Sequence, residues 1–372
     1  MKKILAFVLS LALLLGCAPA LAQTVQEPSR LVVASNTQMS GSFFTDLWGN
    51  NSSDMDVRGL IHGYSTVAWL RSGEYAVDAT VVSALDTSVS NRGQKIYQFT
   101  LNRGLTWNDG TPITARDYVF SALLLNSPAI AELGASNQSM EHVIGHDAYA
   151  SGRSAAFAGV RLLDEYSFSL LVDDDYLPYF YELMLVNVTP YPMQAIAPGV
   201  GVADDGEGAY LTGPFSAELL RGTLLGETGY IQSPTLTSGP YLLAGYDAAT
   251  HVAQLRKNPH YLGNFEGRVP EIEELEFRCV ASEDMVAALE SGEVDILNKV
   301  TDGNVINALL ALRQEGSIGS VNYLRAGYGF LAFACEEGAT SDAAVRKAIA
   351  MCVDTDRICQ EVFEGYALPV YG

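Results

Sequence analysis

Short apolar runs separated by polar, turn-rich segments make up most of the chain. Residues 31–34 form a continuous apolar run, which predicts a buried strand that opens into the polar loop 35–42. Tyr97, Phe99 and Leu101 alternate with polar residues and predict a half-buried strand. Further strands are predicted at residues 166–172, 238–246, 252–255, 272–279, 294–297 and 328–333, of which 238–246 and 252–255 are expected to pair as a hairpin.

Helix-capping patterns predict the best-defined helices. Thr114 stands three residues before Asp117, close to a capping box, and apolar residues follow at helical spacing. Ser282 is expected to cap a helix that ends before Gly292, which gives a strand–helix–strand unit with its neighbours. Near the end, Val345, Ile349, Cys352 and Val353 form one helical face, and Thr355 is expected to cap a helix that stops at Gly365.

Four segments are weakly patterned or ambiguous. Residues 73–78 predict a hairpin, and residues 129–160, rich in Gly, Ala and Ser, predict a loop-heavy region. Residues 177–188 indicate an apolar helix or a buried segment. Residues 199–213 carry many glycines and acids, which is typical of an exposed loop.

The N-terminus indicates an export signal over residues 1–22. Lys2 and Lys3 precede an apolar stretch at 4–15 that is shorter than the roughly 20 residues a membrane-spanning helix needs. Two cleavage sites remain open. Leu-Leu-Gly followed by Cys17 resembles a lipobox, in which Cys17 would be lipidated, whereas Ala-Leu-Ala at 20–22 would give a mature start at Gln23.

The composition limits the number of domains and the kinds of partner that the protein can have. With 372 residues, 48% of them hydrophobic, the chain is long enough for two or three cored domains. The 43 acidic residues exceed the 22 basic ones and give a formal charge of −21, which argues against a nucleic-acid partner. Four further cysteines (Cys279, Cys335, Cys352, Cys359) lack C-x-x-C spacing, which argues against structural zinc and leaves their disulfide state open.

The sequence contains little that indicates a catalytic or metal site. His142 and His146 make an H-x-x-x-H pair, but the loop-like surroundings with Gly145 weaken a metal site there. The acidic runs 173–175 and 204–207 lack the spacing of an EF-hand and favour solvated loops. The sequence therefore predicts a protein that is not an enzyme and that has no cofactor and no metal site.

Six motifs in order carry a resemblance to a known family. They are the strand at 97–101 with the L-T-W-N-D-G-T-P of 105–112, the T-A-R-D-Y-V-F-S of 114–121, the S-G-P-Y of 238–241, the R-K-N-P-H-Y of 256–261, the S-G-E-V-D of 291–295, and the V-R-K-A-I of 345–349 with Asp354. Together they resemble the extracytoplasmic solute-binding proteins, family 5, which serve ABC importers of peptides and nickel. The likeness covers about residues 96–366 and is nearest to oligopeptide- and dipeptide-binding members.

The resemblance implies an α/β fold of the type II periplasmic-binding-protein kind, with two lobes around a cleft. It implies a lobe I core at 23–65 and 175–270, an extra subdomain in lobe I at 66–174, and lobe II at 271–372. Family members continue beyond this point, so lobe II is expected to be incomplete and the chain truncated at its C-terminus.

The resemblance also implies a function. The expected protein is exported to the periplasm or the outer face of the cytoplasmic membrane. There it would bind peptides or similar small solutes and deliver them to a permease and its ATPase subunits. Membrane attachment would come only from a lipid on Cys17, and a monomer is expected. An exported peptide receptor or chaperone for signalling, a nickel-binding member of the family, and an exported hydrolase are the alternatives.

Three groups of residues are candidates for ligand contact. Asn36, Thr37, Met39 and Ser40 belong to the polar loop after the first strand. Ser238, Gly239 and Tyr241 are expected at the hinge, and Tyr328 and Phe330 on one side of a lobe II strand. The competing interpretations are an ordinary loop, a structural strand entry and core aromatic residues. The W-N-D-G turn at 107–110 is expected to be scaffold.

Overall fold

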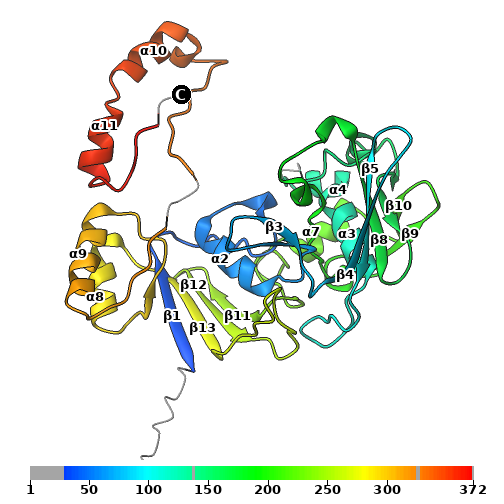
Figure 1. Cartoon of the computed structure of the whole chain (residues 1–372), viewed down its shortest axis with the longest axis horizontal. Helices are drawn as coiled ribbons and strands as arrows, with labels where there is room; N and C mark the ends of the chain where they lie inside the picture. The colour runs from blue at the N-terminus through cyan, green and yellow to red at the C-terminus, as the bar shows by residue number, and fades with distance from the viewer. Residues whose placement is uncertain (1–28, 136–138, 324–326, 371–372) are drawn as a thin grey trace, which may run out of the picture.

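The computed structural model describes residues 29–135, 139–323 and 327–370. The expected signal peptide and Cys17 lie outside the described residues. Figure 1 shows a central sheet around β1, with α8 and α9 on one side of it, and a second group of strands and helices at the far end. The last helices, α10 and α11, stand away from both groups.

The central sheet has five strands in the order β11-β12-β13-β1-β14. β1 is parallel to β13 and to β14, whereas β12 is antiparallel to both β11 and β13. The predicted strands at 31–34, 238–246, 252–255, 272–279 and 294–297 are therefore confirmed, as is the hairpin. The bounds are β1 Arg30–Ser35, β11 Tyr241–Asp247, β12 Val252–Lys257, β13 Glu274–Cys279 and β14 Ile296–Leu297.

The connection from β13 to β14 runs through α8 (Met285–Glu290), and β1 lies between the two strands. The prediction that Ser282 caps this helix is wrong, because residues 282–284 first form a 3-10 turn and Asp284 occupies the cap position. The Ser282 hydroxyl instead accepts a hydrogen bond from the Asn36 amide at 3.2 Å. The expected lobe boundary at 271 stays a prediction, but the strand pairing groups β13 and β14 with β1.

A second, antiparallel sheet of order β4-β5-β8-β7 lies within residues 66–174, which are expected to form the extra subdomain. Tyr97 and Phe99 on β5 are buried, as the alternation predicts. The Thr114 amide donates to the Asp117 carboxylate at 2.8 Å, which confirms the capping box that starts α3. The bounds are β4 Val82–Val89, β5 Lys95–Leu101, β7 Val160–Leu162, β8 Ser167–Val172 and α3 Ala115–Leu125.

Two predicted segments are wrong in this region. Residues 199–213 are not an exposed loop, because β9 (Gly201–Asp204) and β10 (Ala209–Thr212) form a hairpin that also pairs with β6 (Ala156–Phe157). Residues 177–188 are neither an α-helix nor buried throughout: a 3-10 turn at Glu182–Val186 follows an open stretch in which Phe180 is 90% exposed.

The remaining elements are short. The hairpin expected at 73–78 is shifted, because its strands are Val67–Trp69 and Tyr75–Val77 and the turn lies between them. Their bounds, with those of the other helices, are β2 Val67–Trp69, β3 Tyr75–Val77, η1 Asp46–Trp48, α2 Ser52–Ile61, α4 Pro128–Ala131, α5 His146–Ala150, η2 Asp174–Tyr176, η3 Glu182–Val186, α6 Met193–Ile196, α7 Ala217–Leu224, η4 Ser282–Asp284 and η5 Ala339–Ser341.

The C-terminal segment is helical but exposed. Helices α9 (Gly303–Gln314) and α10 (Ala343–Met351) form, yet Ile349 and Val353 on the predicted apolar face are exposed. Asp354, not Thr355, caps α11 (Thr355–Arg357), since its carboxylate accepts from the Arg357 amide at 2.9 Å. A π-helical turn, η6 (Ile358–Val362), follows. Within the described ranges, no helix has both the length and the apolar character needed to cross a bilayer.

The W-N-D-G turn is bonded to residues 235–237, far from it along the chain. The Asn108 backbone amide donates to the Thr237 carbonyl at 2.9 Å. The Asn108 side chain accepts from the Thr237 amide at 3.2 Å and donates to the Thr235 carbonyl at 3.0 Å. Trp107 is fully buried beside it. These contacts support a scaffold role for the turn.

Replacing Asn108 with alanine is expected to lower the free energy of unfolding by about 2 kcal/mol, because two side-chain hydrogen bonds are lost. Urea denaturation of the wild type and the variant measures the change. Asn91→Ala, on an exposed turn in the same subdomain, is the control and should change stability by less than about 0.5 kcal/mol. Equal stability of all three proteins would contradict the scaffold role.

Candidate functional site

The carboxyl ends of three parallel strands meet at one edge of the central sheet. β13, β1 and β14 run in the same direction, so Ser35, Cys279 and Leu297 end their strands on the same side. In open α/β sheets, ligands bind outside this edge, where the chain connections diverge. A binding site is therefore expected at this edge of the sheet.

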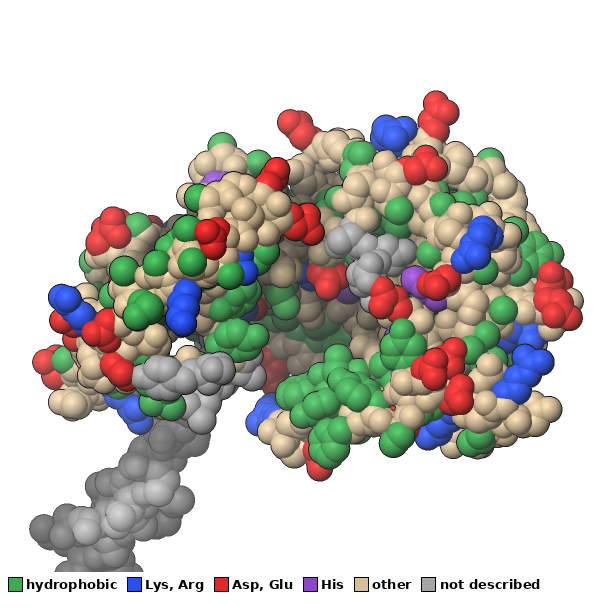
Figure 2. Space-filling view, turned by 90° about the horizontal axis from the view of Figure 1, so that it is seen from above, with side chains coloured by type: hydrophobic (Ala, Val, Ile, Leu, Met, Phe, Trp, Pro, Cys, Tyr) green, Lys and Arg blue, Asp and Glu red, His purple; other side chains and the backbone are tan. Residues whose placement is uncertain are grey.

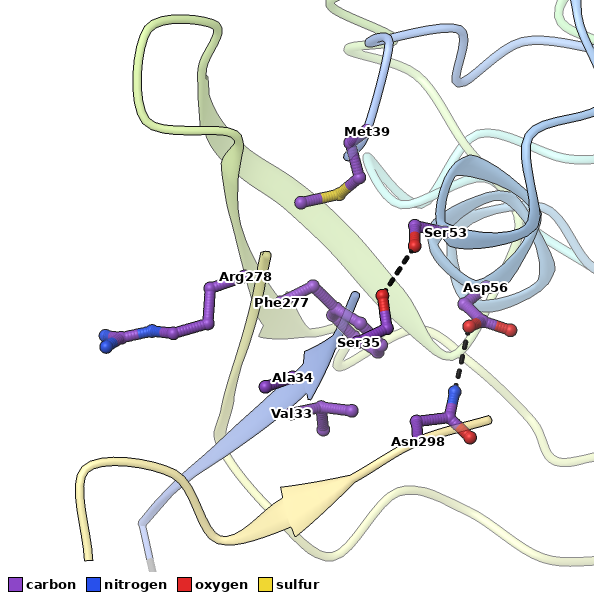
Figure 3. Close-up of a pocket in the computed structure, with 9 residues that line it drawn as sticks. All are labelled: Val33, Ala34, Ser35, Met39, Ser53, Asp56, Phe277, Arg278 and Asn298. Carbon is purple, nitrogen blue, oxygen red and sulfur yellow. Dashed lines mark hydrogen bonds between the residues drawn. The ribbon is translucent and has the colours of Figure 1, made fainter. Parts of the chain in front are cut away.

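A small pocket that is partly open to solvent lies at this edge (Figure 3), and its cavity volume is about 10 Å³. The start of α2 closes one side of it, and the ends of the three strands form its floor. Its lining residues are Val33, Ala34, Ser35, Met39, Ser53, Asp56, Phe277, Arg278 and Asn298.

Hydrogen bonds fix the polar groups between α2 and the strands. The Ser35 and Ser53 hydroxyls are 2.7 Å apart, and the Ser53 hydroxyl also donates to the Thr37 carbonyl at 2.8 Å. The Asp56 carboxylate accepts from the Asn298 amide at 2.9 Å and from the Lys299 ammonium at 2.7 Å. The polar groups are thus held in place before any ligand arrives.

Arg278 lines the pocket but is held by acidic partners. In Figure 3 its side chain points away from the two serines. Its guanidinium donates to Glu293 at 3.0 Å and to Glu276, which also binds Arg30. Burial raises the pKa of Glu276, but the hydrogen bonds and charges of Arg278 and Arg30 outweigh it, so the pKa lies below its usual value.

The pocket offers hydrogen bonding and apolar contact. Hydroxyls, a carboxylate and a primary amide stand beside the apolar side chains of Met39 and Phe277. Groups of these kinds match the N–H and C=O groups of a peptide backbone or the polar groups of a small solute. No sequence pattern pointed to Ser53, Asp56 or Asn298 as site residues. Asn298 could have been found, since it directly follows a predicted strand.

The loop residues predicted as ligand contacts divide into two groups. Met39 lines the pocket, and the carbonyl of Thr37 binds Ser53 beside it. The Asn36 side chain reaches Ser282 instead. The Ser40 amide and hydroxyl both donate to the buried carboxylate of Asp54. Ser40 therefore shapes the loop from within.

The predicted hinge residues are buried against the end of α2 and against residues 63 and 272 of the same chain. The Ser238 hydroxyl accepts from the Gly63 amide at 3.0 Å, and the Gly239 amide donates to the Ile61 carbonyl at 2.8 Å. The Tyr241 hydroxyl donates to the Ile272 carbonyl at 3.0 Å. None of the three lines the pocket.

Tyr328 and Phe330 do not lie on a strand. The strand expected at 328–333 is wrong, because among the described residues no other strand lies beside this segment and a strand needs a partner. Tyr328 is 73% exposed and Phe330 is 77% exposed, so the alternative interpretation as core aromatic residues is also wrong. Their rings are 5.8 Å apart.

Among the described residues, the histidines and cysteines do not come together in a common metal site. His142 binds the Leu185 carbonyl, and His146 begins α5 and lies 3.4 Å from Asp147. His260 stands beside Gly110. Across the described residues, no group of three or more His, Cys, Asp or Glu side chains is placed to hold a metal ion. The four described cysteines are free.

Comparison with known proteins identifies the class of protein. The profile of the bacterial extracellular solute-binding proteins, family 5 (middle region), matches residues 80–372. The chain belongs to this family, whose members are binding proteins. The extracytoplasmic location expected from the sequence agrees with this membership.

Individual relatives support the assignment. The chain is 25% identical, over 76% of its length and 46% of the relative's, to the periplasmic oligopeptide-binding protein OppA of Salmonella typhimurium. It is 23% identical, over 76% and 46%, to the periplasmic murein peptide-binding protein MppA of Escherichia coli. The chain thus spans about half the length of the curated relatives it matches.

Solved structures share the fold. OppA of Burkholderia pseudomallei matches with a TM-score of 0.65 at 17% identity, covering 93% of this chain and 60% of that one. NikZ from Campylobacter jejuni, solved with Ni(L-His), matches with a TM-score of 0.61 at 16% identity, covering 91% and 56%. The expected α/β fold of two-lobed periplasmic binding proteins is confirmed.

Proposed function

We propose that this protein is the extracytoplasmic binding component of an ABC importer and that it binds peptides or similar small solutes. One observation carries the proposal: a chain of the solute-binding family has a polar, preorganised pocket at the carboxyl ends of three parallel strands. Ser35, Asn298 and Met39 are the proposed contacts there, and the backbone of Asn36 and Thr37 borders them.

The other predicted contacts remain part of the proposal in changed roles. Ser40, Ser238, Gly239 and Tyr241 are proposed to shape the site through their buried hydrogen bonds. Because β13 and β14 pair with β1, we place the second lobe after α9 rather than at 271. The exposed rings of Tyr328 and Phe330 would then belong to the opposite wall of the cleft.

The proposed cycle needs no chemistry in this chain. Ligand would shift an equilibrium between open and closed forms, and the closed form of the monomer would dock on a permease whose ATPase subunits supply the energy. A lipid on Cys17 would keep the protein at the membrane.

Thermal unfolding with ligands tests the proposal. A pool of synthetic di- to pentapeptides is expected to raise Tm, because a ligand at 100 times its Kd stabilises the folded protein by about 2.7 kcal/mol. Asn298→Ala should reduce the shift, whereas Asn50→Ala, on the exposed surface before α2, should not. Loss of peptide uptake on deletion of the gene distinguishes import from a receptor role.

Three other results would contradict the proposed binding of peptides. The first is that no peptide in the pool changes Tm. A shift with nickel salt alone would indicate the nickel-binding alternative, and turnover of the peptides by the pure protein would indicate a hydrolase.

A further inference from the structure

Five aromatic rings form a connected array between the β2–β3 hairpin and residues 179–181, and none of the five lines the pocket. Trp69 and Tyr75 face each other across the β2–β3 hairpin, with ring centroids 4.5 Å apart. Tyr75 meets Tyr181 edge to face at 5.7 Å. Tyr181 in turn contacts Phe180 at 4.8 Å and Tyr179 at 6.1 Å. We call Trp69, Tyr75, Tyr179, Phe180 and Tyr181 the aromatic surface.

The aromatic surface is unusually open to solvent. Phe180 is 90% exposed, Trp69 is 56% exposed and Tyr179 is 46% exposed. Single exposed apolar residues are ordinary, but a contiguous group of large rings marks an interaction site. Figure 2 shows a broad gathering of hydrophobic side chains at the edge of the hollow between the two parts of the molecule.

The charges around the aromatic surface are mainly negative. Asp173, Asp174 and Asp175 precede Tyr179 by four to six residues, and Glu74 lies in the turn of the β2–β3 hairpin. None of these four forms an ion pair with another described residue.

The basic residues of this region are mostly neutralised. Lys95 pairs with Glu182, and Arg71 lies 3.6 Å from Glu266. Arg92 lies in the turn whose Gly93 is beside Asp174, and it forms no ion pair with another described residue. The aromatic surface therefore presents ring faces within an acidic surrounding.

We propose that the aromatic surface binds positively charged side chains of peptides, as a contact separate from the pocket. The proposal rests on the proposed function in one respect, that the ligand is a peptide. Ring faces attract ammonium and guanidinium groups through the quadrupole, by about 0.5–1 kcal/mol at an exposed site. The surrounding carboxylates add attraction over a Debye length of about 8 Å at physiological salt.

The chemistry favours a cation over an uncharged apolar partner. An apolar partner would have to cover the rings and also remove water from the four neighbouring carboxylates, which costs free energy without compensation. A lysine or arginine side chain lays its aliphatic stem on the rings and keeps its charge close to the carboxylates. Peptides carrying several such residues therefore match the aromatic surface along its length.

Fluorescence of Trp69 tests the proposal directly. Trp69 is the exposed one of the three tryptophans, since Trp107 is buried and Trp48 is partly buried. Acetyl-tetralysine-amide is expected to change its emission saturably, and raising salt from 0.05 to 0.5 M should weaken the response. Phe180→Ala should weaken binding about fivefold. Phe180 makes little packing contact, so this variant should stay folded.

Matched controls separate the rings from general acidity. Leu163→Ala removes an apolar side chain that is 45% exposed elsewhere in the subdomain, and it should bind tetralysine like the wild type. Acetyl-tetraglutamine-amide should give no saturable change. Equal binding of the two peptides, or equal binding by Phe180→Ala and the wild type, would overturn the proposal. Self-association that Phe180→Ala abolishes would also overturn it, because a second copy would then be the occupant.

The result is distinguishable from a failure of the proposed function. If the peptide pool raises Tm while tetralysine leaves the emission of Trp69 unchanged, the proposed peptide binding is supported and the aromatic surface does not bind cations. If tetralysine binds, and binds more weakly to Phe180→Ala but not to Leu163→Ala, while no peptide in the pool raises Tm, cation binding by the aromatic surface is supported and the importer function is contradicted.

Discussion

Replacing Gly239 with alanine is expected to lower the free energy of unfolding by about 3 kcal/mol. A Cβ atom at this position would lie 2.3 Å from the Leu60 carbonyl oxygen and 2.5 Å from the Ile61 carbonyl carbon. Both atoms belong to the backbone at the end of α2, which cannot turn aside as a side chain can. The entry into β11 would have to move away from the helix, and the 2.8 Å bond from Gly239 to Ile61 would be lost.

Urea denaturation measures this change, and the same strand offers a control. Gly245 lies further along β11 with no heavy atom within 4 Å of its added Cβ, so Gly245→Ala should change stability by about 0.5 kcal/mol or less. If Gly239→Ala were as stable as Gly245→Ala but bound peptide more weakly, Gly239 would face the ligand rather than α2.

Sequence patterns correctly predicted the elements that are determined by residues close together in the chain. The capping box needs only Thr114 and Asp117, and burial of alternate residues on β5 needs only the side-chain period of a strand. The error at 199–213 has the opposite origin. The acids and glycines at 205–208 form the turn of a hairpin, and the carboxylate of Asp204, at the end of β9, accepts hydrogen bonds from Arg161, 43 residues away, at 2.8 Å.

The candidate site could be predicted only in part for the same reason. The loop after the first strand was identified because parallel strands place ligands at their carboxyl ends. The pocket also needs Asn298, which is 242 residues from its partner Asp56. No pattern along the chain indicates that β1 inserts between β13 and β14, and this strand order brings Ser35, Asp56 and Asn298 together.

Acidification from pH 7 to pH 4 is expected to cost the folded protein about 3 kcal/mol through His62 alone. Burial is the main cause that lowers the pKa of His62 to about 4, and the nearby charge of Arg58 lowers it further. The hydrogen bond between His62 Nε2 and the Phe43 carbonyl, 2.8 Å long, opposes this without reversing it. His62 is partly exposed, but its Nδ1 atom is buried and has no hydrogen-bond partner among the described residues.

The sign of the effect follows from proton uptake. The unfolded chain protonates this histidine near pH 6.5, whereas the folded protein does not do so until about pH 4. Between these values the unfolded state binds more protons, so the stabilising contribution is complete above pH 6.5 and is lost as the pH falls towards 4.

Comparison with His62→Gln isolates this contribution. Glutamine can donate to the Phe43 carbonyl but does not titrate, so the stability difference between wild type and variant should shift by about 3 kcal/mol between pH 7 and pH 4. Burial raises the pKa of Asp117 to about 6, which acts in the opposite direction, but this group is common to both proteins and cancels. His260→Gln, at an exposed position, should follow the wild type at every pH. A constant difference between wild type and His62→Gln would show that His62 is protonated equally in the folded and unfolded states.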